Sequence, residues 1–127
     1  MRIIKGFQIQ GSSAAIGAGL TVNLLAGLEP LTQVPANQHL IITGLATYSG
    51  ADAATFGKVK WNFLANGIVM DGSLLDQTDQ VGVQNQPMML GAPLRIEGGQ
   101  TLSVTAKNTD AVSHSAGVLL VGYYAVD

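Results

Sequence analysis

The chain has 127 residues, a formal net charge of −2 and no cysteine. Its length fits a single domain, and the absence of cysteine excludes disulfides and thiolate metal sites. The 6 basic residues are scattered, which argues against direct nucleic-acid binding, because phosphate contacts require clustered positive charge. Only 11% of the residues are charged, against about 25% in ordinary soluble domains. A surface so poor in charge indicates coverage by a partner, most simply by further copies of the same chain.

The N-terminal part combines an apolar strand with a run of small residues. Residues 3–9 predict a short strand whose apolar side chains are Ile3, Ile4, Phe7 and Ile9. Residues 11–19 consist of glycine, serine and alanine around one isoleucine, which predicts a flexible arm. We therefore separate residues 1–19, a strand with a flexible arm, from residues 20–127, the sandwich domain. The first strand either pairs inside its own sheet or docks on a sheet edge of a partner, and both interpretations stay open.

Further short strands are predicted along the rest of the chain, separated by turns rich in glycine, proline and asparagine. They cover residues 20–25, 40–48, 58–63, 68–70, 94–96, 101–107 and 116–126, with weaker candidates near 81–83 and 88–90. Residues 29–35 contain two prolines and are predicted to be a connection. No segment sustains the 3.6-residue period of a helix over several turns, so no helix is predicted. About eight short strands in one domain indicate an all-β, antiparallel, jelly-roll-like sandwich.

The clearest local signal is a hairpin centred on Asn66 and Gly67. Before this turn, Val59, Trp61 and Phe63 alternate with polar residues, so their side chains are predicted to face the core. Asparagine followed by glycine is preferred where both central residues of a two-residue turn need positive φ. The sequence therefore predicts a tight antiparallel hairpin with an aromatic inner face.

The last strand, residues 116–126, is nearly continuously apolar, which is typical of a strand covered on both faces. The sandwich core covers one face, so the other predicts contact with a neighbouring subunit. Tyr123 and Tyr124 must point in opposite directions, and one of them is a candidate for a subunit or ligand contact. The candidate interface residues of the whole chain are Ile3, Ile4, Phe7, Ile9, Phe56, Tyr123 and Tyr124.

Residues that could carry catalysis or hold a metal ion are sparse. His39 and His114 are the only histidines. His114 could act as a base beside Ser113 or Ser115, but we interpret it as a solvated loop histidine, because no full catalytic constellation accompanies it. The acidic residues in 71–79 lack the spacing of a calcium loop. We therefore predict no enzymatic activity, no catalytic residue, no metal site and no cofactor.

Three segments together resemble a known family. They are the hairpin of residues 59–68, the paired strands of residues 93–108 and the ending of residues 118–124. In pattern, residues 38–127 are similar to the small jelly-roll decoration or cement proteins on the heads of tailed bacteriophages. Other viral and cell-surface jelly rolls share the same pattern, and the family has no fixed site motif that carries a functional residue over to this chain.

The resemblance implies a virion protein without enzymatic activity. It would bind the major capsid protein on the outside of an expanded capsid, often as a trimer, and clamp neighbouring capsid subunits against internal DNA pressure. Assembly in the host cytoplasm fits the expectation that residues 1–6 do not start a signal peptide and that no stretch spans a membrane. The alternatives are a receptor-binding fibre or tail adaptor and a carbohydrate-binding module of a secreted enzyme.

Overall fold

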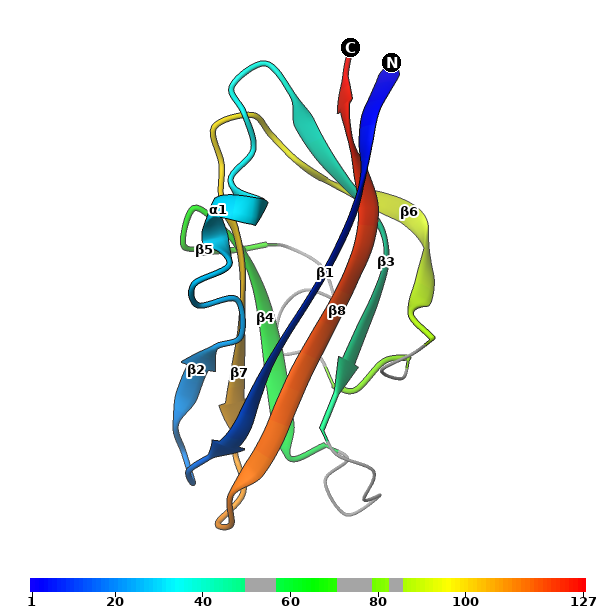
Figure 1. Cartoon of the computed structure of the whole chain (residues 1–127). Helices are drawn as coiled ribbons and strands as arrows, with labels where there is room; N and C mark the ends of the chain where they lie inside the picture. The colour runs from blue at the N-terminus through cyan, green and yellow to red at the C-terminus, as the bar shows by residue number, and fades with distance from the viewer. Residues whose placement is uncertain (50–56, 71–78, 83–85) are drawn as a thin grey trace.

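The computed structural model describes residues 1–49, 57–70, 79–82 and 86–127. Almost all regular structure in these residues is β-strand (Figure 1). The elements in chain order are β1 (Arg2–Ile16), β2 (Thr21–Asn23), α1 (Glu29–Thr32), β3 (His39–Tyr48), β4 (Val59–Ala65), β5 (Ile68–Val69), β6 (Met88–Ile96), β7 (Leu102–Asn108) and β8 (His114–Val126). The predicted all-β class is confirmed.

The strands form two antiparallel four-stranded sheets packed face to face. Sheet A has the order β1-β8-β3-β6, and sheet B has the order β2-β7-β4-β5. The pairs β1–β8, β2–β7, β3–β6 and β4–β5 are those of one long hairpin that has been folded over on itself. This wrapping defines a jelly roll, so the predicted sandwich and its jelly-roll character are both confirmed.

The core lies between the two sheets and is filled by alternate residues of the central strands. Val59, Trp61 and Phe63 of β4 are 1%, 0% and 0% exposed, as the alternation predicts. Leu102, Val104 and Ala106 of β7 are fully buried opposite them. Because side chains at i and i+2 of a strand share one face, these two short patterns define the face of sheet B that packs on the core.

The structure corrects the expected flexible arm. Residues 11–16 continue β1, which pairs with β8 in an unbroken antiparallel run from Ile9 to Ser13. Ile16 is 1% exposed and belongs to the core. Gly11 lies so close to the backbone carbonyl of Leu24 that a β-carbon there would clash. The small residues therefore allow two backbones to approach closely. Their small side chains are needed for packing and do not indicate a flexible arm.

The outer face of β8 was predicted to be covered by a neighbouring subunit, and the structure shows a different arrangement. β8 is a central strand between β1 and β3. Leu120 faces the core and is fully buried, whereas Leu119 faces outward and is still only 5% exposed in the single chain. Its burial therefore does not require a second subunit. Tyr123 on the same outer face is half-buried.

Smaller differences concern element lengths. β1 and β8 have 15 and 13 residues, so the eight strands are not all short. The two predicted strands at residues 88–90 and 94–96 are parts of β6, an edge strand that tolerates Pro93. Residues 29–32 form a single helical turn, α1, with proline near its start. Of the strand predicted over residues 20–25, only Thr21–Asn23 form β2, and Leu20 before it is 60% exposed.

The predicted hairpin is confirmed, and it supports a first quantitative prediction. Asn66 and Gly67 have φ values of 52° and 79°, and a β-carbon on Gly67 would meet no atom within 4 Å. Gly67→Val therefore tests the backbone conformation alone, and we expect it to lower the free energy of unfolding by about 1–2 kcal/mol. Gly67→Asn is the matched control, because asparagine adopts positive φ more readily. Equal denaturant midpoints for the two variants would contradict the predicted backbone strain.

Candidate interaction site at the free edge of β1

The edges of the two sheets differ in how well they are protected. The edge strands are β1 and β6 in sheet A and β2 and β5 in sheet B. β2 and β5 have only 3 and 2 residues, and β6 carries Pro93. β1 has 15 residues and no proline. Because exposed edges recruit further strands unless they are short or interrupted, β1 is the long open edge of the described sheets.

Only the first part of β1 is open. Its end is covered, because the Asn108 side chain donates a hydrogen bond to the carbonyl of Ile16 at 2.8 Å and Gly11 lies against Leu24. Across residues 2–10, the described backbone hydrogen bonds run to β8 alone. A strand bonded on one side leaves every second N–H and C=O pointing away from its partner. We call residues 2–10 the free edge.

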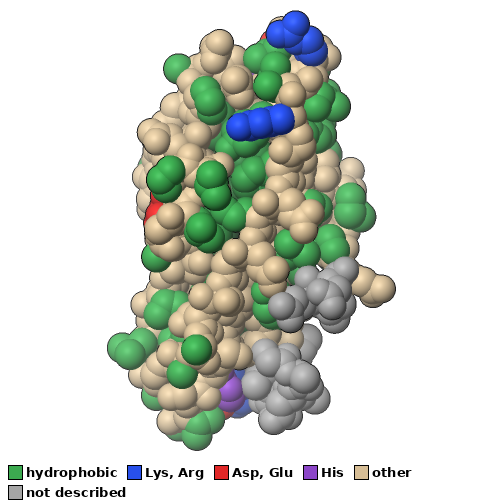
Figure 2. All heavy atoms as spheres, viewed as in Figure 1, with side chains coloured by type: hydrophobic (Ala, Val, Ile, Leu, Met, Phe, Trp, Pro, Cys, Tyr) green, Lys and Arg blue, Asp and Glu red, His purple; other side chains and the backbone are tan. Residues whose placement is uncertain are grey.

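A groove lies beside the free edge, between β1 and α1. Its volume is about 170 Å³. It is lined by Lys5, Gly6, Phe7, Gln8, Ile9, Leu31 and Tyr124. Figure 2 shows apolar side chains gathered over this part of the molecule, with basic groups near them towards the upper end.

Tyr124 organises this groove. Its side chain is almost buried, its hydroxyl donates a hydrogen bond to the carbonyl of Leu31 at 2.6 Å, and burial raises its pKa. The ring of Phe7 stands perpendicular to the Tyr124 ring, at 89° and with 5.7 Å between centroids. The ammonium group of Lys5 lies 4.9 Å from the centre of the Tyr124 ring. The tyrosine thus holds an aromatic wall and a cation in fixed positions.

The free edge carries positive charge without a counter-ion. Neither Arg2 nor Lys5 forms an ion pair with any carboxylate that the structure describes. Residues 6–28 contain no charged side chain at all, and Glu29 accepts a hydrogen bond from Asn23 at 2.8 Å. The edge therefore combines two cations with an otherwise apolar and uncharged surface.

The predicted interface residues separate into three groups. Phe7, Ile9 and Tyr124 meet in the groove, with Ile9 only 6% exposed. Ile3 and Ile4 lie on the free edge and are 59% and 41% exposed. Tyr123 is elsewhere, on the outer face of sheet A, and Phe56 lies outside the described residues.

Four groove residues were missed by sequence reasoning: Lys5, Gly6, Gln8 and Leu31. Lys5 alternates with Phe7 and Ile9, so strand spacing could have placed it beside them. Strict alternation along residues 3–9 would place Ile3 on that face too, but β1 shifts register between Ile3 and Lys5. Leu31 reaches the groove from α1 and is 60% exposed, and nothing in its local sequence signals this position.

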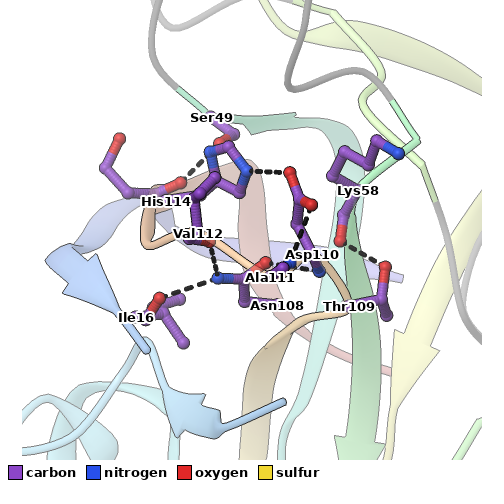
Figure 3. A network of polar contacts seen from close by, with 10 residues as sticks. Ile16, Ser49, Lys58, Asn108, Thr109, Asp110, Ala111, Val112 and His114 are labelled. Carbon is purple, nitrogen blue, oxygen red and sulfur yellow. Dashed lines mark hydrogen bonds and ion pairs between the residues drawn. The ribbon is translucent and has the colours of Figure 1, made fainter. Parts of the chain in front are cut away.

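The second polar feature is a network at the β7–β8 hairpin (Figure 3). The His114 ring lies 2.8 Å from a carboxylate oxygen of Asp110, and its side chain is only 11% exposed. Asn108 is fully buried and its amide binds the carbonyls of Ile16 and Val112. His114 is therefore not the solvated loop histidine that we expected. It pairs with Asp110 inside the hairpin, and the Asn108 side chain joins the hairpin to the end of β1.

This network predicts a measurable dependence of stability on pH. The hydrogen bond from His114, followed by that from the Ala111 amide, lowers the pKa of Asp110 from its ordinary 3.8. The ionised carboxylate therefore stabilises the fold above about pH 4, and this contribution is lost as pH falls through the lowered pKa. We expect Asp110→Asn to melt at a lower temperature than the wild type at neutral pH. Its melting temperature should also fall less than that of the wild type upon acidification. Parallel curves of melting temperature against pH would contradict this.

Other classes of site find little support in the described part of the chain. No group of three or more His, Asp or Glu residues there is arranged to hold a metal ion. The calcium candidate at residues 71–79 falls almost wholly outside the described ranges. Among the helices of the described residues, none is long and apolar enough to cross a membrane.

The fold and the groove define a class of protein: a jelly-roll sandwich with one open sheet edge. A scan of protein-family models and searches of curated proteins and solved structures found no match to this chain. Its function must therefore be argued from the free edge and the groove.

Proposed function

We propose that this chain is a non-enzymatic structural protein of a virion. It binds the major capsid protein on the outside of an expanded bacteriophage head and stabilises the shell as a decoration or cement protein. The observation that supports this best is the free edge of β1 with its groove, because an open edge next to an apolar groove is suited to binding another polypeptide. The low charge content of the chain agrees with extensive contacts.

A catalytic role has less support. The described residues contain two His–Asp pairs: His114–Asp110 is tied into the β7–β8 hairpin, and His39–Asp127 joins a buried imidazole to an exposed carboxylate at 3.6 Å. Neither pair lies in the groove at the free edge, which offers Lys5 and Tyr124 for positioning. Lys5 is held against an aromatic ring beside an apolar wall, which favours recognition of a side chain. The arrangement is that of a binding surface.

Two of the aromatic side chains are inaccessible to a carbohydrate, as their strand alternation predicts. Trp61 and Phe63 are fully buried, so neither can stack on a sugar ring. A receptor-binding fibre or tail adaptor remains a rival role for the same jelly roll. Glycan-array binding by the isolated chain would favour these alternatives over decoration.

The direct test adds the purified chain to heads of the phage that encodes it and measures bound copies after sedimentation. We expect saturable binding to expanded heads, weak binding to unexpanded heads and a raised temperature of head disruption. Sedimentation equilibrium of the free chain tests the accompanying proposal of a homo-oligomer, with a trimer as the expected state. Absence of binding to expanded heads would overturn decoration.

A further inference from the structure

We propose that the free edge of β1 binds an extended segment of the capsid partner that carries an apolar residue and, two positions away, an acidic one. The segment adds to sheet A as a further strand. This inference rests on the proposed function, because it assigns the segment to the capsid partner. It is carried by three properties of the edge: open backbone groups, a groove for one side chain and unpaired positive charge.

The backbone supplies the first part of the recognition. The outward N–H and C=O groups of residues 2–10 lack a partner strand in the described chain. An added strand would satisfy these groups, and its main-chain hydrogen bonds would provide affinity independent of sequence. The other long edge, β6, is interrupted by Pro93, so strand addition is directed to β1.

The groove supplies selection for an apolar side chain. Its volume of about 170 Å³ is well below the roughly 300–1,000 Å³ of pockets that enclose drug-sized ligands. Phe7 and Leu31 form apolar walls on either side, and the Tyr124 ring closes the inner end. A space of this size and lining accepts one aliphatic side chain of a strand lying along β1.

The positive charge on the free edge favours an acidic residue two positions from that apolar side chain in the added strand. Lys5 and Phe7 are two positions apart on β1 and share one face. A residue of the added strand that faces Lys5 is therefore two positions from the residue in the groove, and a carboxylate there would pair with the Lys5 ammonium group. Arg2 extends the positive charge towards the N-terminus.

A second copy of the same β1 fits this chemistry less well. Its free edge carries Arg2 and Lys5, and no acidic residue occurs before Glu29. Pairing two copies of β1 would leave both sets of cations without a carboxylate. Charge complementarity thus favours a different, acidic segment as the occupant.

The test uses fluorescence anisotropy of a labelled peptide, Val-Thr-Leu-Thr-Glu-Thr-Val-Thr, and of its counterpart with leucine and glutamate exchanged. We expect at least one of the two peptides to bind. Replacing its glutamate with lysine should weaken the affinity about tenfold. Lys5→Glu and Leu31→Asp should weaken binding to a similar extent, since both side chains are at the surface of the groove. Lys107→Glu, an exposed charge reversal on sheet B, is the control and should bind like the wild type.

Backbone methylation separates strand addition from simple side-chain binding. Two versions of the peptide carry N-methyl groups on alternate residues, one in each phase. Because only one edge of an added strand faces β1, one phase should abolish binding and the other should retain it. Binding that survives both phases would overturn strand addition, and so would equal binding of the glutamate and lysine peptides.

The same measurements separate this inference from the proposed function. The peptide assay contains no capsid, so failure of both peptides would overturn the acidic-segment proposal while head sedimentation still tests decoration. Loss of head binding in Lys5→Glu, with Lys107→Glu unaffected, would support both. Self-association of the free chain through β1, with neither peptide able to bind, would assign the edge to a second copy and overturn the inference.

Discussion

Trp61→Ala is expected to lower the free energy of unfolding by about 3–5 kcal/mol, the usual cost of removing a large aromatic side chain from a core. Trp61 is 0% exposed at the centre of β4 and belongs to the main hydrophobic cluster between the two sheets. A loss of this size is a large fraction of the stability of an ordinary domain. Circular dichroism in a denaturant series should show a markedly lower midpoint. The chain has one tryptophan, so tryptophan fluorescence cannot follow the unfolding of this variant.

Trp61→Phe is the matched control. The indole N–H of Trp61 is buried without an acceptor in the described structure, and an unsatisfied buried donor carries a desolvation cost. Phenylalanine removes that donor and retains most of the apolar contact, so we expect a clearly smaller loss than for alanine. A midpoint for Trp61→Ala close to the wild type would mean that the tryptophan is exposed, and would restore the carbohydrate-binding alternative.

Gly122→Ala is expected to prevent normal folding or to destabilise the domain by about 3 kcal/mol or more, because overpacking forces backbone shifts. A β-carbon at Gly122 would lie 1.9 Å from the backbone carbonyl oxygen of Ile41 on β3. β3 shifts register between Ile42 and Gly44, next to this contact. One methyl group would therefore separate the two central strands of sheet A. Soluble yield and thermal unfolding should both report the effect.

Gly6→Ala provides the comparison within the same sheet. A β-carbon at Gly6 meets no atom within 4 Å, so this substitution should change stability by no more than about 0.5 kcal/mol. The contrast isolates steric contact from the general preference of strands for residues other than glycine. Similar unfolding midpoints for Gly122→Ala and Gly6→Ala would show that β8 and β3 do not approach as described.

Local patterns determined the parts of the fold in which one face of a strand meets the core. Val59, Trp61 and Phe63 alternate with polar residues, and the Asn66–Gly67 pair supplies the two positive φ values of the turn. These features depend on neighbours in sequence, so the hairpin could be derived without knowledge of the remaining chain. Composition and strand number then led to the sandwich.

The tertiary structure decided the features that depend on segments distant in sequence. The small residues of 11–16 have the composition of a flexible arm, and only their pairing with β8 and contact with Leu24 make them part of a regular strand. Leu119 is buried within the single chain, on a strand that has a neighbour on each side, and an apolar run by itself cannot distinguish this from a subunit contact.

The groove illustrates the same division. The sequence placed Phe7, Ile9 and Tyr124 among the interface candidates, because an N-terminal apolar strand and an aromatic pair in the last strand are visible locally. It did not bring them together or add Leu31, whose carbonyl accepts the Tyr124 hydroxyl across 93 positions of sequence. Strand periodicity reports which way a side chain points but not which distant segment it meets, and that meeting depends on the wrapping of the whole jelly roll.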